Sequence, residues 1–239
     1  MRCLIADLIT ELPSSGGLAP RCRDYMYYGE EKPHIIVDEK LYRPEHYPSN
    51  LPYNTLAYME AAYQFCLALV DFGGFYLHAS AVVVDEYAYL FSGHSHAGKS
   101  THARQWQAVF GDGAVVINDD KPALRRIDGV WYAYGTPWCG KDGINTNRKA
   151  PVAGVCFLKK GQENKIRRMT KAETVQNILS QTIYKFQSAD QLDKMLTQLE
   201  TFLEEVPVYE LENRPEPDAA RLCYETMRSG IQEVTNETE

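Results

Sequence analysis

The stretch Gly93-His94-Ser95-His96-Ala97-Gly98-Lys99-Ser100 decides the fold of this chain. It reads glycine, four residues, then glycine-lysine-serine, which is the pattern of a phosphate-binding loop. The glycines let the backbone turn tightly, so that successive N–H groups point at phosphate oxygens. Lys99 supplies a positive charge for the outer phosphates, and Ser100 supplies a hydroxyl for Mg²⁺. We therefore predict that this loop, continued by Thr101, binds the phosphates of a nucleotide.

The residues on either side of the loop predict a strand before it and a helix after it. Two apolar, β-prone runs, 81–84 and 87–91, are separated by Asp85-Glu86 and indicate a hairpin. Residues 101–110 contain helix formers and no glycine or proline before Gly111. This order aims a helix N-terminus at a bound anion. It argues against the alternative, a glycine turn that binds nothing.

Composition narrows the class of protein. The 239 residues carry 25 Lys and Arg against 32 Asp and Glu, a formal charge of −7, whereas nucleic-acid-binding domains are usually basic. No apolar run approaches the ~20 residues of a membrane span, and Asp7 comes too early for a signal peptide. The six cysteines are scattered without a Cys-x-x-Cys pair, which fits neither a zinc site nor a disulfide scaffold. We expect a cytoplasmic protein with reduced thiols and no nucleic-acid or membrane partner.

The remaining pattern predicts an α/β fold whose β core is mixed and largely antiparallel, with helices packed outside it. Asp128-Gly129 indicates a second hairpin, between 123–127 and 130–134. Helices are expected over 54–71 with Asn54 as N-cap, from a capping box at 170–173, from Ser188, and over 218–227. At the N-terminus we expect a strand over 2–9 and pairing of 25–28 with 34–37. We divide the chain into a phosphate-loop domain at 76–230, an N-terminal part at 1–75 that packs on the same unit, and a frayed polar tail at 231–239.

An acidic pair follows the next apolar strand. Asp119 and Asp120 come after 114–117, a run expected to lie near the loop strand. In phosphate-loop enzymes an acidic residue in this place holds Mg²⁺. Two adjacent carboxylates can have different roles, because one can bind the metal while the other accepts a proton from an attacking hydroxyl. An isolated Asp-Asp pair would otherwise indicate a surface turn.

These features together resemble the catalytic domain of HPr kinase/phosphorylase, a family that shares its nucleotide site with phosphoenolpyruvate carboxykinase. The resemblance is carried by Leu77-His78-Ala79-Ser80, the loop with Thr101, and the strand that ends in Asp119-Asp120. The segments 118–122, 135–141 and 147–151 are more similar to bacterial HPr-kinase-related proteins, some of which occur in peptide-maturation gene clusters. The resemblance is strong over 78–158 and weak in the C-terminal helices, and residues 1–50 resemble no family.

The resemblance implies a role for each matched residue. Lys99 and Ser100 match the phosphate lysine and the magnesium hydroxyl. Asp119 matches the catalytic base, Asp120 a metal partner, and His78 a histidine near the transferred phosphate, although a lone histidine in an apolar strand is equally a core residue. The glycine-rich signature that engages HPr and the separate N-terminal domain of that family are both absent. HPr as the substrate and the reverse reaction are therefore not implied.

A glycine- and lysine-containing loop, 135–149, stands where that signature would be. From the chemistry of phosphoryl transfer we choose Lys141 and Arg148 as cations that stabilise the transferred group. The alternative for each is a solvated surface cation. Trp138 is expected to anchor the loop.

The sequence thus predicts an ATP- and Mg²⁺-dependent kinase acting on a hydroxyl, with a serine of a peptide or small protein as the favoured acceptor. One alternative is a small-molecule kinase or a carboxykinase-like enzyme. Another is a module that binds ATP without transferring phosphate. A generic phosphate-loop ATPase is disfavoured, because such enzymes have parallel sheets and the hairpins here are antiparallel. The related kinases are often hexamers, so the resemblance allows a homo-oligomer for this chain, although nothing in its residues fixes an oligomeric state.

Overall fold

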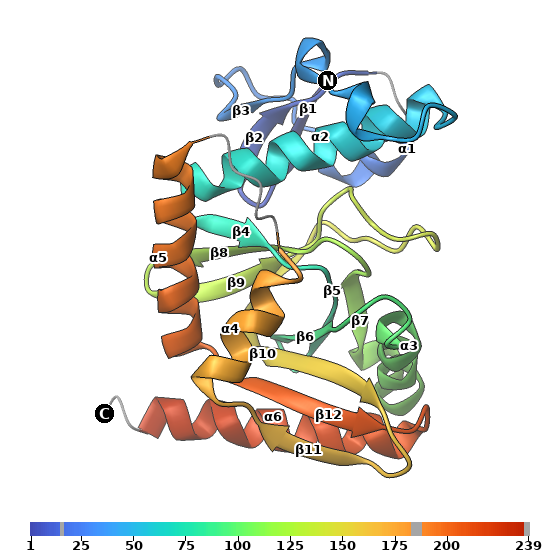
Figure 1. Ribbon diagram of the computed structural model, residues 1–239, viewed down its shortest axis with the longest axis vertical. Coiled ribbons are helices and arrows are strands. Elements are labelled where there is room, and N and C mark those ends of the chain that lie inside the picture. Colours follow the sequence, from blue (N-terminus) through green and yellow to red (C-terminus); the bar gives the residue numbers. More distant parts are fainter. Residues whose placement is uncertain (15–16, 183–187, 237–239) are drawn as a thin grey trace.

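The computed structural model describes residues 1–14, 17–182 and 188–236 and is built around one large mixed sheet (Figure 1). This nine-stranded sheet has the order β4-β8-β9-β10-β6-β5-β7, with β12 beside β10 and β11 beside β12. Its strands are β4 (Gly74–Tyr76), β5 (Ala79–Val84), β6 (Tyr87–Ser92), β7 (Val115–Asn118), β8 (Ala123–Ile127), β9 (Val130–Tyr134), β10 (Lys149–Lys160), β11 (Lys165–Arg168) and β12 (Val208–Asn213). Only the pairs β10–β6 and β10–β12 are parallel in this sheet. The predicted α/β class with a mixed, largely antiparallel core is confirmed.

Strand β10 joins the two parts of the sheet. Its first residues pair with β9, and the stretch from Val152 onward pairs with β6. The register shifts between Val152 and Gly154, and β12 lies along the far edge of the same strand. A bulge of this kind bends a strand and increases its local twist. The long strand therefore connects the β8–β9 hairpin to the strands that carry the phosphate loop.

The β5–β6 hairpin has a helix layer on each side. Val82, Val84, Tyr89 and Phe91 pack with Trp106 of α3 (Lys99–Phe110) and with α6 (Pro217–Asn236). The alternate residues of the same strands, including Val83 and Leu90, face a second core with α4 (Lys171–Leu179) and α5 (Ala189–Glu205). This period-two alternation is what a strand buried on both faces requires. The predicted turn at Asp85-Glu86 is confirmed, with φ of 48° and 67°.

Residues 1–75 form a layer over one end of the main sheet. Strands β1 (Arg2–Ile5), β2 (Leu8–Glu11) and β3 (Ile35–Ile36) make a small sheet, and α1 (Leu18–Arg21) and α2 (Tyr53–Leu69) complete the layer. Figure 1 shows α2 lying between this small sheet and β4. The two units share a core in which Phe65 of α2 packs on Trp138, with ring centroids 4.8 Å apart. Arg125 of β8 also donates a hydrogen bond of 2.7 Å to the carbonyl of Ala6.

Several expectations for this layer are wrong. The stretch 2–9 is a hairpin rather than one strand, because Ala6 and Asp7 turn at φ of 51° and 60°. Residues 34–37 do not pair with 25–28, since Ile35 pairs with Thr10 in a parallel register. Helix α2 begins at Tyr53 with Pro52, not Asn54, at the N-cap.

The C-terminal elements follow the predicted signals. Thr170 and Glu173 form the capping box of α4, and the side chain of Ser188 caps α5. The first of these helices, expected to run to about residue 183, ends earlier, at Leu179, with Ser180 as its C-cap. Helix α6 continues to Asn236, past residue 231, where a polar tail was expected to begin. None of the described helices is long and apolar enough to cross a membrane, and all six cysteines are buried free thiols.

Candidate functional site

The loop predicted to bind phosphate lies between the end of β6 and the first turn of α3. Gly93 and Gly98 have φ of 141° and 100°, conformations that side chains disfavour, and His96 has φ of 65°. A Cβ atom at Gly93 would also lie 3.0 Å from Cβ of Ala97. Gly98 occupies the N-cap of α3 without a side-chain cap, so the first amides of the helix are free to bind an anion. The backbone has the conformation that the motif predicts.

Lys99 lies along the inside of this loop. Its Nζ donates a hydrogen bond of 3.0 Å to the carbonyl of Gly93. Burial lowers the pKa of Lys99, and the nearby charge of Asp120 partly opposes that shift. Lys99 and Asp120 thus interact electrostatically. Ser100 and Thr101 follow in the first turn of α3, and His94, Ser95 and His96 are exposed at the tip of the loop.

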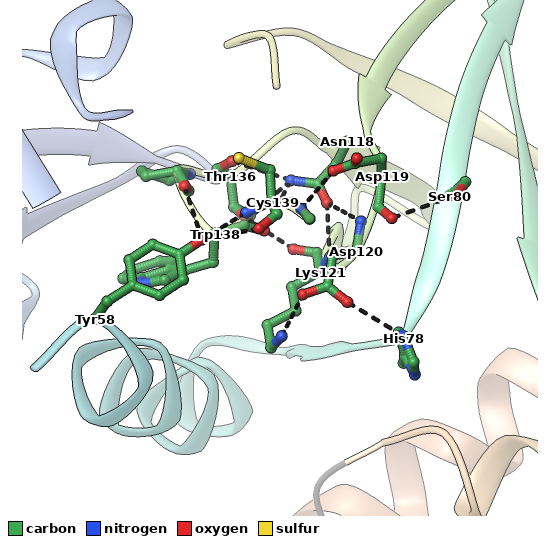
Figure 2. Close-up of polar contacts among 12 residues, drawn as sticks. Tyr58, His78, Ser80, Asn118, Asp119, Asp120, Lys121, Thr136, Trp138 and Cys139 are labelled. Atoms are coloured by element: carbon green, nitrogen blue, oxygen red, sulfur yellow. Dashed lines mark hydrogen bonds and ion pairs between the residues drawn. The ribbon is translucent and has the colours of Figure 1, made fainter. Parts of the chain in front are cut away.

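The acidic pair is brought beside the loop by β5, which pairs with β6 on one side and β7 on the other. The turn that follows β7 is organised by Asn118. Its Oδ1 accepts hydrogen bonds from the amides of Asp120 and Lys121, at 2.9 and 2.6 Å. Its Nδ2 donates to the carbonyls of Thr136 and Trp138. One buried amide side chain therefore ties the acidic pair to the loop 135–147 (Figure 2).

The two aspartates have different environments. Burial raises the pKa of Asp119, the charge of Asp120 adds to this shift, and a hydrogen bond from the Gly140 amide opposes it. Burial also disfavours the charged form of Asp120, but His78 and Lys121 outweigh it and lower the pKa to about 2. His78 Nε2 lies 3.2 Å from Asp120 Oδ1, and Lys121 forms an ion pair with Oδ2. Asp119 is the better proton acceptor of the two, and Asp120 stays ionised to lower pH.

The loop 135–147 holds Asp119 from the other side. The Gly140 amide donates a 2.6 Å hydrogen bond to Asp119 Oδ1. Cys139, the preceding residue, is fixed by Tyr58 of α2, whose hydroxyl accepts from its amide at 2.8 Å and donates to its carbonyl at 3.0 Å. Arg21 of α1 donates to Tyr58 Oη and to Cys139 Sγ, both at 3.1 Å. The N-terminal layer therefore supports the carboxylate of Asp119.

Trp138 and the two chosen cations have different positions. The expectation that Trp138 anchors its loop is confirmed, since it is 1% exposed and packs on Phe65. Lys141 lies between Gly140, which binds Asp119, and Asp142, which pairs with Arg104 of α3. Lys141 is exposed beside the site.

Arg148 is not brought to this site, which corrects the expectation for it. Its guanidinium pairs with Glu86 at 3.3 Å, in the turn before β6. The six residues of β6 separate that turn from the phosphate loop and span about 20 Å. Arg148 therefore lies at the wrong end of the strand to reach a phosphate bound at Lys99.

A cavity of about 420 Å³ adjoins the phosphate loop. Residues of the loop, of α3, and of the segments after β10 and β12 line it, among them His96, Thr101, Gln105 and Asn213. Gln105 is 8% exposed, and its Oε1 has no hydrogen-bond partner among the described residues. The volume is that of a small-ligand pocket.

The donor atoms fit a magnesium ion bound with phosphates. The described residues contain no cluster of three or more His, Cys, Asp or Glu side chains that could hold a metal by themselves. Mg²⁺ instead takes one or two carboxylates together with substrate phosphates. Asp120, with its pKa near 2, offers an ionised oxygen ligand, and Ser100 offers a hydroxyl. These hard oxygen donors are the set expected for Mg²⁺ in a phosphate-loop site.

Some residues of this site carry no motif of their own. Tyr58, Arg21 and Asn118 are positioned by contacts between distant parts of the chain, as in the 81-residue separation of Tyr58 and Cys139. The only local signal was the adjacency of Asn118 to the acidic pair. Gly140 lay within the segment 135–141 that carries the resemblance.

Comparison with solved structures gives a distant likeness. No protein-family model matches this sequence, and no curated protein matches it. Among solved structures, the HPr(Ser) kinase/phosphatase from Coxiella burnetii matches with a TM-score of 0.40 and 13% sequence identity. That match covers 68% of this chain and 94% of the other. At this TM-score the likeness does not assign the chain to a family.

Proposed function

We propose that this chain is an ATP- and Mg²⁺-dependent phosphotransferase of the HPr-kinase-like type that phosphorylates a hydroxyl, in particular a serine of a peptide or small protein. The observation that carries the proposal is that β5 places the loop of Lys99 beside an acidic pair, in which Gly140 binds Asp119 and His78 pairs with Asp120. Phosphoryl transfer needs a phosphate cradle, a magnesium ligand and a proton acceptor. Each requirement has a residue here.

In this proposal the loop amides and Lys99 hold the β- and γ-phosphates. Ser100 and Asp120 hold Mg²⁺, which neutralises charge on the phosphates when bound. The base and ribose occupy the cavity lined by Thr101 and Gln105, because it adjoins the loop at the N-terminus of α3. Lys141 provides a further positive charge near the transferred group. Its place in the chain next to Gly140, which binds Asp119, supports this role.

The reaction then follows from the difference between the carboxylates. Asp119 takes the proton of the acceptor hydroxyl, whose oxygen forms a bond to the γ-phosphorus. The bond from that phosphorus to the β–γ bridging oxygen breaks, and ADP leaves. His78, 3.2 Å from Asp120, keeps that carboxylate in place beside the transferred phosphate.

The free, buried cysteines support a cytoplasmic location in the same proposal.

The proposal is tested by measuring ATP binding and phosphate transfer on the same protein. Calorimetry with ATP in the presence of Mg²⁺ should give binding that Lys99→Met weakens at least tenfold. Incubation with γ-labelled ATP and a panel of serine peptides should then label an acceptor. Binding of ATP without transfer to any peptide, protein or small hydroxyl compound would instead favour a nucleotide-binding module. No ATP binding would contradict both.

A further inference from the structure

A second pocket lies against the N-terminal layer, with Lys121 in its wall. It has a volume of about 140 Å³ and is lined by four tyrosines, by Met59 of α2 and by Lys121. The tyrosines are Tyr47, Tyr58, Tyr63 and Tyr76. Figure 2 shows the side chain of Lys121 directed toward α2, on the same side of the acidic pair as Tyr58.

This pocket is joined to the reacting groups by two of its own wall residues. Lys121 forms an ion pair with Asp120. Tyr58 holds Cys139, whose neighbour Gly140 binds Asp119. A group in the pocket therefore lies beside Lys121, the partner of Asp120, so an acceptor anchored here can present its hydroxyl to the acidic pair. The phosphate loop and its cavity are built from other residues, so this pocket is not needed for the nucleotide.

The size and chemistry of the pocket limit what it can hold. Pockets for whole small-molecule ligands measure about 300–1,000 Å³, so 140 Å³ holds only one side chain of a larger acceptor. Aromatic rings and a methionine suit an apolar or aromatic side chain, and Tyr and Met are typical of protein-binding surfaces.

A neighbouring hollow extends the surface away from the acidic pair. It has a volume of about 350 Å³ and shares Tyr63 with the first pocket. Its lining includes Lys40 and Arg43 and, among the described residues, no carboxylate. Arg43 lies over the Tyr63 ring, 4.4 Å from its centroid, and 3.9 Å from buried Glu60, whereas Lys40 is exposed and has no ion pair within the described chain. Asp38, Glu39 and Glu60 act on Tyr42 in the wall of this hollow, so a carboxylate is favoured only beside Lys40.

We infer that these adjoining pockets bind the acceptor as an extended peptide. The residue beside the phosphorylated hydroxyl places an apolar or aromatic side chain among Tyr58, Met59 and Tyr63, and an acidic residue farther along lies near Lys40. This inference rests on the proposed function for the identity of the acceptor. It gives the N-terminal layer a role in choosing the substrate.

The test uses the ¹³C-labelled methyl group of Met59 as a reporter, assigned by its disappearance in Met59→Leu. The probes are acetylated hexapeptides with Phe on either side of a serine and Glu two or three residues beyond. Matched peptides carry Gly for Phe or Gln for Glu. Titration of the Met59 resonance should show that the Phe peptides bind with at least tenfold higher affinity than the Gly peptides. The Glu peptides should bind more tightly than the Gln peptides.

Two variants separate the pocket from the helix that carries it. Met59→Trp fills the pocket, and Asn54→Trp places the same side chain at an exposed position of α2 outside its lining. With fluorescently labelled Phe peptide, the first should lose at least tenfold in affinity and the second less than twofold. Equal affinity for Phe and Gly peptides, or unchanged binding by Met59→Trp, would overturn the inference. ATP affinity is measured on the same samples to test the phosphate loop. A protein that binds the Phe peptides and does not bind ATP would count against the proposed function alone.

Discussion

The backbone amide of Gly140 donates a hydrogen bond of 2.6 Å to Oδ1 of Asp119. This contact connects the glycine-containing loop to the residue that we assign as the base. It also lowers the pKa of Asp119, against the larger effect of burial. The position and the basicity of this carboxylate thus depend on a loop that is itself held by α1 and α2.

The close packing of Gly140 against Asp119 leads to a first prediction. A Cβ atom at Gly140 would lie 2.9 Å from Asp119 Oδ2, so Gly140→Ala must displace the carboxylate. We expect kcat to fall about 10- to 100-fold, because small misplacements of reacting groups are costly, while ATP affinity changes little. Steady-state kinetics with calorimetry for ATP checks this. Gly113→Ala is the matched control, since nothing lies within 4 Å of a Cβ there, and equal kinetic effects at the two glycines would refute the role of Gly140.

Tyr58 is predicted to act through the same loop. Tyr58→Phe removes the hydroxyl that accepts from the Cys139 amide, leaving that amide without a partner at a cost of about 1–3 kcal/mol, while the Cys139 carbonyl keeps its 3.3 Å bond from Arg21. A misaligned Gly140 amide would weaken the bond that lowers the pKa of Asp119. The acid limb of the kcat/KM profile should therefore move to higher pH. Tyr53→Phe, at an exposed tyrosine of the same helix, should leave the profile in place; a shift of similar size there would show a general effect of α2.

Asp120 is predicted to stabilise the fold in a pH-dependent manner. Its pKa falls from 3.8 to about 2 in the folded protein, so its contribution is present above pH 4 and is lost as the pH falls through 2. The shift corresponds to at most about 2 kcal/mol. Urea unfolding of Asp120→Asn and of the unaltered protein should differ most near pH 6 and converge between pH 4 and pH 2. A difference in free energy of unfolding that does not depend on pH would contradict the assigned pKa of Asp120. Asp112→Asn, at an exposed site, is the control.

Gln105 is predicted to recognise the nucleotide base. Its amide lies in the wall of the cavity beside the loop and carries both a donor and an acceptor, as a match to the edge of adenine requires. Gln105→Leu should weaken ATP binding about tenfold, equivalent to about 1.4 kcal/mol, and reduce any preference for ATP over GTP. Competition against a fluorescent ATP analogue measures both. Gln107→Leu, on the exposed side of α3, should bind ATP normally, and equal losses at the two glutamines would place the base elsewhere.

The local features of this protein were predictable because their causes are local. The turns at Asp85-Glu86 and Asp128-Gly129 need residues that accept positive φ, and each is preceded and followed by a β-prone run. The capping box of Thr170 and Glu173 is a signal within four residues. The phosphate loop is likewise a contiguous motif. Such features depend on backbone preference and on neighbours in the sequence, so a single sequence is enough to predict them.

The features that failed depend on contacts between distant residues. The first hairpin turns at Ala6-Asp7, which carries no glycine or proline signal. The parallel pairing of Ile35 with Thr10 is set by tertiary packing. Arg148 was chosen for its charge, but the pairing of β10 with β9 places it near Glu86, 62 residues away in the sequence. The support of Asp119 by Tyr58 through Cys139 has the same non-local origin, so the motif identified the carboxylate and not what holds it.

The central claim is that Asp119 accepts the proton of the hydroxyl that is phosphorylated. Single-turnover transfer from γ-labelled ATP to an acceptor peptide, with ATP binding measured in parallel, tests it most directly. Asp119→Asn should bind ATP and Mg²⁺ normally and transfer phosphate about 10²- to 10⁴-fold more slowly, the usual contribution of a general base. Transfer at an unchanged rate by Asp119→Asn would contradict the account.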